Sequence, residues 1–101
     1  MKYYQQGDTI YYPVKLPEDI EKLETNIVQE GEATGHAHRL HGNGFQLYQR
    51  PSDKVKFLKL VSATPLRHEE HKEINLPPGE YRIGIVREYN HFDEEARAVI
   101  D

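Results

Sequence analysis

Histidines with the spacing of metal ligands fall in two short clusters. The first is His36-Ala37-His38 and the second is His68-Glu69-Glu70-His71. Residues i and i+2 of a strand project from one face about 6.5 to 7 Å apart, so His36 and His38 can reach the same ion. Imidazole is a good ligand for divalent transition metals. The sequence therefore predicts a metal site with zinc, iron, manganese or nickel as the cofactor and these candidate ligands: His36, His38, His68 and His71.

The second cluster leaves more than one ligand set open. Residues i and i+3 point to opposite faces of a regular strand, so His68 and His71 face one site only where a turn or bulge separates them. Without that break, His68 pairs with Glu70, or Glu69 pairs with His71, and a carboxylate joins the site. The competing interpretation is a hydrogen-bonded network in which carboxylates orient the imidazoles and no metal binds.

Composition excludes several classes of protein. The 101 residues include no cysteine, which removes disulfides, thiolate metal sites and iron–sulfur clusters. The net charge of −4 disfavours nucleic acid as a partner. No stretch approaches the roughly 20 apolar residues of a membrane helix, and the first residues lack the apolar segment of a signal peptide. We therefore expect one domain over residues 1–101, no membrane partner and a cytoplasmic location.

No sequence motif selects an enzyme class. The chain has no Gly-x-Ser-x-Gly, no phosphate-binding loop and no Gly-x-Gly-x-x-Gly, and the second histidine cluster is one residue shorter than the His-Glu-x-x-His of zinc peptidases. A metal-dependent hydrolase with Glu70 as the base is the third alternative for the function. The sequence leaves enzymatic activity undecided.

Alternation of apolar and polar residues predicts an all-β fold, a small barrel or sandwich with one or two short helical turns. We expect a helical turn at Pro17–Leu23, and a short helix or an extended tail at Phe92–Ile100. The segment His41-Gly42-Asn43-Gly44 has the composition of a hairpin turn. The expected strands cover residues 8–16, 26–29, 33–40, 44–49, 54–61 and 81–89, with the hairpin turn pairing residues 33–40 with 45–49.

Aromatic residues are expected to supply much of the core. Alternation places Tyr11, Tyr12, Tyr81 and Tyr89 in strands, where large rings bury most area. Tyr3 and Tyr4 lie in an otherwise polar terminus, and this indicates packing against a second copy of the chain. A homo-oligomer and an unidentified protein partner are therefore expectations for this sequence.

Five motifs occur in order along nearly the whole chain: Gln6-Gly7-Asp8, Glu30–His38, Leu66–His71, Leu76–Tyr81 and Arg87-Glu88-Tyr89. In these motifs the sequence resembles an uncharacterised family of small proteins found in bacterial and phage genomes. The resemblance implies a common fold and shared positions for both histidine clusters, but no activity. The rival to metal binding is a phage-type accessory or structural interaction module whose histidines form a hydrogen-bonded network, which Tyr3, Tyr4 and the C-terminal segment indicate.

A more distant resemblance, in architecture alone, is to the cupins. It rests on the His-x-His segment and on the later Pro77-Pro78-Gly79 turn. The chain departs from the cupin pattern at His41 and Gly42, which stand where the resemblance would place a metal-binding carboxylate. The order of the turn and the second histidine cluster differs as well.

Overall fold

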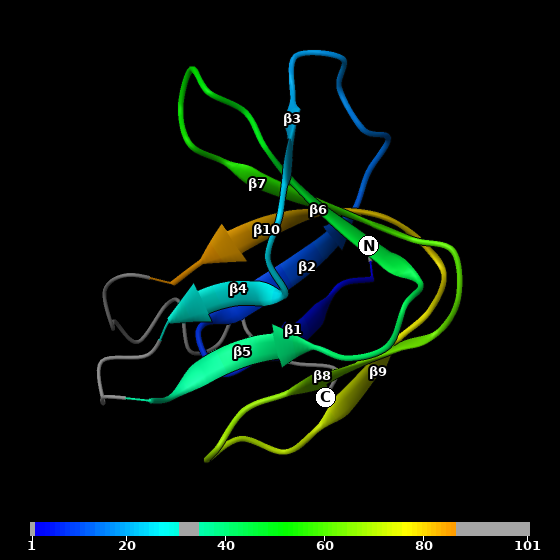
Figure 1. Ribbon diagram of the computed structural model, residues 1–101. Coiled ribbons are helices and arrows are strands. Elements are labelled where there is room, and N and C mark those ends of the chain that lie inside the picture. Colours follow the sequence, from blue (N-terminus) through cyan, green and yellow to red (C-terminus); the bar gives the residue numbers. More distant parts are fainter. Residues whose placement is uncertain (1, 31–34, 87–101) are drawn as a thin grey trace.

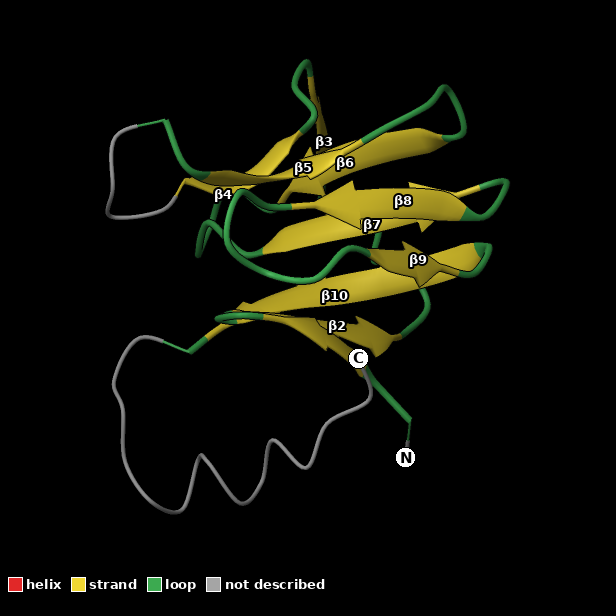
Figure 2. Ribbon diagram, turned by 90° about the horizontal axis from the view of Figure 1, so that it is seen from below, coloured by secondary structure: helices red, strands yellow, loops and turns green. Residues whose placement is uncertain are grey.

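The fold consists of two antiparallel β-sheets, seen here in a computed structural model that describes residues 2–30 and 35–86. The larger sheet has the strand order β1-β2-β10-β7-β6-β3 and the smaller sheet has the order β4-β5-β8-β9 (Figure 1). Every regular element in these residues is a strand, and neither sheet closes into a barrel (Figure 2). The strands are β1 (Tyr4–Gln6), β2 (Thr9–Pro13), β3 (Glu21–Leu23), β4 (Ile27–Glu30), β5 (Ala37–Leu40), β6 (Phe45–Gln49), β7 (Lys56–Leu60), β8 (Thr64–Arg67), β9 (Ile74–Leu76) and β10 (Gly79–Ile85). The all-β prediction is confirmed.

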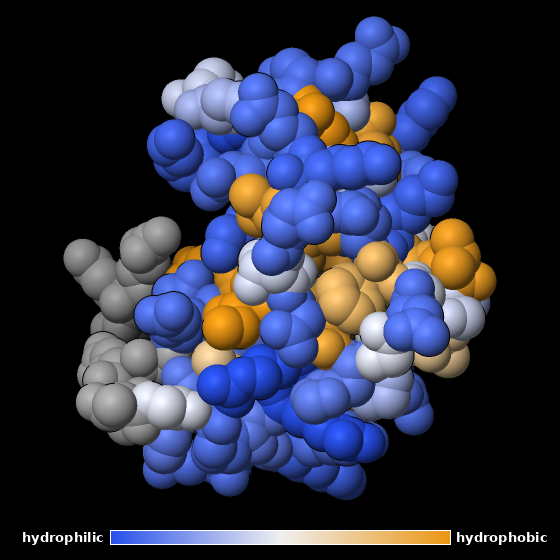
Figure 3. All heavy atoms as spheres, viewed as in Figure 1, coloured by the Kyte–Doolittle hydropathy of each residue, from blue (hydrophilic) through white to orange (hydrophobic). Residues whose placement is uncertain are grey.

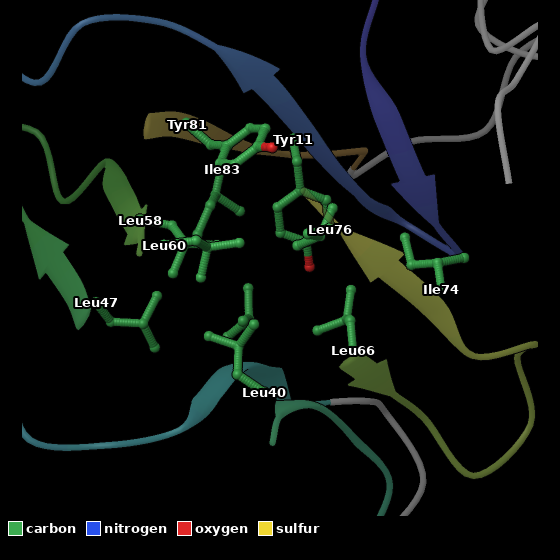
Figure 4. Packing of buried hydrophobic residues seen from close by; sticks show 11 residues of the cluster. Tyr11, Leu40, Leu47, Leu58, Leu60, Leu66, Ile74, Leu76, Tyr81 and Ile83 are labelled. Carbon is green, nitrogen blue, oxygen red and sulfur yellow. The ribbon is translucent and has the colours of Figure 1, made fainter. Parts of the chain in front are cut away.

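A single apolar core lies between the two sheets. Side chains from both sheets point toward one another in Figure 4, where Leu47 and Leu58 of the larger sheet face Leu40 and Leu66 of the smaller one. Burying a leucine or tyrosine in such a layer stabilises the fold by roughly 1.5 to 3 kcal/mol. The cluster comprises Tyr11, Val28, Leu40, Leu47, Leu58, Leu60, Leu66, Ile74, Leu76, Tyr81 and Ile83.

The β1–β2 hairpin brings the first motif of the chain to the edge of the larger sheet. Gln6 pairs with Thr9, which leaves Gly7 and Asp8 as a two-residue turn. Gly7 has a φ of +57°, and glycine is favoured at this first turn position because L side chains rarely adopt a positive φ. The main-chain N–H of Val86, just beyond β10, donates to the Asp8 carbonyl at 2.9 Å and holds the turn in place.

A half-buried lysine also links the two sheets. Nζ of Lys56 in β7 donates to the main-chain carbonyl of Val28 in β4 at 2.8 Å. This carbonyl lies where the β4–β5 register shifts, between Ile27 and Gln29. Burial lowers the pKa of Lys56, and the nearby charge of Glu30 opposes that change. The ammonium group therefore satisfies an acceptor at an irregular point of the ladder.

Two sequence predictions about local structure are wrong. The segment predicted as a helical turn, Pro17–Leu23, instead ends in strand β3, which pairs with β6. The segment His41–Gly44 does not form a hairpin, because β5 pairs with β4 and β8 while β6 pairs with β3 and β7. It is a connection from one sheet to the other. Tertiary pairing overrides the local turn preference here.

The other predicted strands are present, but several begin or end at different residues. Five of the expected strands correspond to β2, β4, β6, β7 and β10, whereas β1, β8 and β9 were not predicted. Of the expected strand over residues 33–40, the structure describes residues 35–40 and begins β5 at Ala37. Gly84 keeps the regular β10–β2 register, and the ring of Tyr12 lies against the position that a Cβ would take. The segment Phe92–Ile100 lies outside the described residues.

The aromatic residues divide between core and surface. Tyr11 and Tyr81 are buried in the core as predicted, whereas Tyr12 lies half-buried on the outer face of the sheet with the Arg82 guanidinium 4.5 Å from its ring centre. Tyr4 packs against the core with its ring edge-on to Tyr81, and the ring of Tyr3 lies 5.8 Å from that of Tyr12. Because both N-terminal rings have partners in the same chain, they do not require a second copy. Tyr89 lies outside the described residues.

The surface of the face seen in Figure 1 is largely hydrophilic, with small separate hydrophobic areas (Figure 3). Within the described residues, the only large hydrophobic side chain classed as exposed is Val61, at 72%. No helix in this part of the chain is suited to crossing a membrane.

The packing of the core predicts a large effect of Leu58→Ala. Leu58 is fully buried, so its truncation leaves a cavity and lowers the free energy of unfolding by about 2 to 5 kcal/mol. Val61→Ala, the control at an exposed position, changes it by less than about 0.5 kcal/mol. Urea unfolding followed by circular dichroism measures both. Equal effects of the two substitutions would contradict the placement of the core.

Candidate metal centre

The structure brings the four predicted histidines together. His36 directly precedes β5, His38 lies within β5, and His68 and His71 lie in the loop between β8 and β9. The ring centres of His38, His68 and His71 form a triangle with sides of 4.4, 4.6 and 5.8 Å. The ring of His36 lies 5.9 Å from that of His68, edge-on. Segments about 30 residues apart in sequence thus meet at one place.

The loop between β8 and β9 explains how both histidines of the second cluster reach the site. Strand β8 ends at Arg67, and the chain bends at Glu69, Glu70 and His71. This is the break that the i, i+3 spacing requires for His68 and His71 to face one way. The Glu70 N–H donates to Nδ1 of His68 at 3.0 Å and closes the bend.

Both ring nitrogens of His38 have polar partners. The side chain is 2% exposed, with Nδ1 at 2.8 Å from Oε1 of Gln6 and Nε2 at 3.1 Å from Oδ1 of Asp8. Burial lowers the pKa of His38, and the nearby His68 lowers it further, against the opposing effect of Asp8. A lowered pKa favours the neutral imidazole, which is the form that binds a metal.

Gln6 fixes which nitrogen of His38 carries the proton. Nε2 of Gln6 donates to the main-chain carbonyls of Leu66 at 2.8 Å and Lys72 at 3.0 Å. These two bonds set the orientation of the amide, so the atom facing His38 is the oxygen, an acceptor. The proton of a neutral His38 therefore lies on Nδ1, and Nε2 presents its lone pair to Asp8 and the neighbouring imidazoles.

The absence of a side chain at Gly7 makes room for His71. A Cβ at Gly7 would lie 2.6 Å from Nε2 and 2.7 Å from Cδ2 of the His71 ring, closer than real contacts allow. The turn of the β1–β2 hairpin is therefore in van der Waals contact with the imidazole. Glycine at position 7 therefore meets two requirements: it adopts the positive φ of the turn, and it leaves space for the His71 ring.

Two glutamates support the cluster in different ways. Glu69 accepts from the Ala37 N–H at 2.9 Å and from the Arg39 guanidinium at 2.6 Å, and these bonds lower its pKa to about 2. It therefore stays ionised and ties the loop to the start of β5. Oε1 of Glu70 lies 3.7 Å from Nδ1 of His36. The lowered pKa of His68 has burial as its main cause, followed by the charge of His71.

Gln6 and Asp8 were not predicted as part of the site. A signal for their position exists in the sequence, because Gly7-Asp8 between two runs with strand composition is a two-residue hairpin signal. No pattern places that hairpin next to the histidines. His41 lies beyond the end of β5, where its main-chain N–H donates to the Pro65 carbonyl, and His91 lies outside the described residues.

The donor atoms of this cluster are close but not aimed at one point. Among residues 2–30 and 35–86, no group of three or more His, Asp or Glu side chains forms a geometry that could hold a metal ion as it stands. Nδ1 of His38 and Nδ1 of His68 form hydrogen bonds instead, and Nε2 of His38 faces the Asp8 carboxylate. The arrangement described is a hydrogen-bonded imidazole cluster.

Residues 5–86 match a protein family described as a domain of unknown function (DUF8820). The chain belongs to the DUF8820 family. The prediction of an uncharacterised family is therefore confirmed. No curated protein and no solved structure matches the chain.

The DUF8820 match covers the whole of the candidate centre. It contains the β1–β2 hairpin, both histidine clusters and the two glutamates between His68 and His71. The fifth sequence motif, Arg87-Glu88-Tyr89, follows the matched residues. The site is therefore a feature of the part of the chain that corresponds to the DUF8820 domain.

The bonds of Gln6 predict a specific effect of Gln6→Met. The substitution removes the partner of Nδ1 of His38 and of the main-chain carbonyls of Leu66 and Lys72, of which the first is buried, and lowers the free energy of unfolding by roughly 2 to 4 kcal/mol. It also frees the His38 proton to move to Nε2, which the ¹⁵N chemical shifts of the imidazole report. The control is Gln46→Met, because Gln46 also donates to two main-chain carbonyls but contacts no histidine of the cluster. An unchanged His38 tautomer in Gln6→Met would contradict the role of Gln6.

The close approach of Gly7 to the His71 ring predicts that Gly7→Ala moves this ring. The new methyl group collides with the imidazole and displaces it, in addition to straining the turn. Gly42→Ala is the control, because Gly42 also has a positive φ but a Cβ there meets no atom within 4 Å. We expect both variants to lose stability and only Gly7→Ala to shift the His71 ring resonances in a ¹H–¹³C spectrum. Unshifted His71 resonances would show that the ring does not contact the turn.

Proposed function

We propose that the protein binds a divalent transition-metal ion through the imidazoles of His36, His38, His68 and His71. The observation that carries the proposal is the triangle of ring centres of His38, His68 and His71. An ion with nitrogen ligands at about 2.1 Å in tetrahedral geometry holds its imidazole ring centres about 5 Å apart. The observed separations, 4.4 to 5.8 Å, bracket that value.

The remaining adjustment is one of ring orientation. Rotation of an imidazole about its Cβ–Cγ bond has a broad profile and costs little. His68 would give up its bond from the Glu70 N–H in either case, because Nδ1 would bind the ion itself or would carry the proton when Nε2 binds it. Nε2 of His38 needs no change, because Gln6 already directs its lone pair toward the cluster. An outer hydrogen bond of this kind is typical of metal-ligating histidines.

The consequence of binding would be structural. The ligands come from β5 and its preceding residue and from the loop between β8 and β9, and the loop also contacts the β1–β2 turn. An ion shared by these segments would cross-link β5 and the loop between β8 and β9, in addition to the pairing of β5 with β8. Three bonded imidazoles with an open position would in addition permit hydrolysis, the third function that the sequence suggested.

A second candidate is a metal-free interaction module. The observation that favours it is that Nδ1 of His38 and Nδ1 of His68 already form hydrogen bonds. In that case the histidines would form a polar network that shapes a surface for another protein. The two candidates differ in a measurable way, because only the first requires metal.

Metal binding is tested with protein purified without an affinity tag. We expect one equivalent of zinc, manganese, iron(II) or nickel to bind, and a metal concentration about 100 times the Kd to raise the free energy of unfolding by about 2.7 kcal/mol. His68→Ala and His71→Ala should each remove that stabilisation, whereas His41→Ala, outside the cluster, should retain it. Isothermal titration and thermal unfolding measure these effects. No binding of any of the four metals by the wild-type protein would overturn the proposal and favour the interaction module.

A further inference from the structure

The side chain of Asp8 approaches the cluster from the turn of the β1–β2 hairpin. Its Oδ1 lies 3.1 Å from Nε2 of His38, and the side chain is 50% exposed. The main chain at this position is fixed by the bond from the Val86 N–H to the Asp8 carbonyl. A buried imidazole nitrogen and a solvent-accessible carboxylate thus face each other across a short gap.

No proton lies between Nε2 of His38 and Oδ1 of Asp8 when His38 is neutral and Asp8 is ionised. Gln6 accepts at Nδ1, which places the proton there and leaves a lone pair on Nε2. The carboxylate of Asp8 also presents only lone pairs when ionised. Two acceptors 3.1 Å apart repel each other, so the pair is complete only when a cation lies beside both atoms or an extra proton lies between them.

The distance itself matches that between two ligand atoms of one ion. Donor atoms bound at about 2.1 Å are about 3.0 Å apart in octahedral geometry and about 3.4 Å apart in tetrahedral geometry. Oδ1 of Asp8 and Nε2 of His38 fall within this interval. His71 lies against the same turn, because its ring fills the space that a Gly7 side chain would occupy.

His36 lies differently from the other three histidines. Its ring is edge-on to that of His68 at 5.9 Å, and its Nδ1 faces the carboxylate of Glu70 at 3.7 Å. It therefore has a carboxylate partner of its own. The carboxylate of Asp8, and not the imidazole of His36, therefore lies beside Nε2 of His38.

We infer that Asp8 is a ligand of the ion, together with His38, His68 and His71, and that His36 lies outside the set of ligands and pairs with Glu70. The inference rests on the proposed metal binding and changes its chemistry. Three imidazoles and one carboxylate form a mixed nitrogen and oxygen site, which favours manganese, iron(II) or zinc, because imidazole suits iron and zinc and a carboxylate suits manganese. The carboxylate also neutralises one of the two positive charges of the ion.

The test compares the metal affinities of Asp8→Asn and His36→Ala by isothermal titration with Zn²⁺ and Mn²⁺. We expect Asp8→Asn to weaken binding by at least about 100-fold, the upper end of what the loss of an outer-sphere partner costs, and His36→Ala to weaken it by less than about 10-fold. Asp19→Asn, which removes the same charge from an exposed loop position, should change the affinity little. Circular dichroism checks that each variant is folded.

A second readout separates a ligand from a group that only adds negative charge. The visible absorption bands of the Co²⁺-loaded protein depend on the donor atoms, so Asp8→Asn should shift them and Asp19→Asn should not. Wild-type binding that is unaffected by Asp8→Asn and abolished by His36→Ala would overturn the inference but leave the proposed function standing. No metal binding by the wild-type protein would overturn both, and a loss of stability in Asp8→Asn would then identify the contact as an ion pair of Asp8 with a protonated His38.

Discussion

The buried amide of Gln6 is the interaction on which the arrangement of the site depends. From the larger sheet it donates to the carbonyls of Leu66 and Lys72, at the two ends of the segment that contains His68 and His71, and it accepts from His38 in the smaller sheet. All three hydrogen-bonding positions that the amide uses are therefore filled by groups distant in sequence. One side chain joins the two sheets, positions the loop and selects the tautomer of the central imidazole. Buried polar groups that are fully paired in this way specify one arrangement rather than several.

The candidate ligands could be predicted from the sequence because their spacing is local. His36 and His38 are two residues apart, and the bend between His68 and His71 was one of the two cases that their spacing allowed. The groups that orient them could not be predicted in this way. Gln6 and Asp8 reach His38 across 32 and 30 residues, and such a contact is set by the packing of the two sheets. Alternation with a period of two predicts on which face of a strand a residue lies. It does not predict which strand or loop packs against that face.

The same limit explains the errors in the fold. The strands with the longest alternation, around Tyr81–Ile85 and Lys56–Leu60, were predicted because half of each strand is buried against one core. Strands β1 and β9 have three residues each, too few for a pattern to emerge, and β8 contains Pro65, which argues against a strand. The residues His41–Gly44 are compatible with a tight turn, yet they connect the smaller sheet to the larger one. This connection allows Leu40 and Leu47, which lie in different sheets, to be buried in the same core. Burial of these leucines outweighs the local preference of the turn.

The distance along the chain between the parts of the site has a consequence for folding. Bonds that join Gln6 to Leu66 and Lys72 close loops of about 60 residues, and contacts of such high sequence separation form late, because the chain must lose much of its entropy before they contribute. The four histidines belong to the smaller sheet and its loops, whereas Gln6 and the turn at Gly7 and Asp8 belong to the larger sheet. The oriented site, with His38 held by Gln6 and His71 against the turn, therefore forms only when the two sheets have docked. Any function of the cluster is in this sense restricted to the fully folded protein.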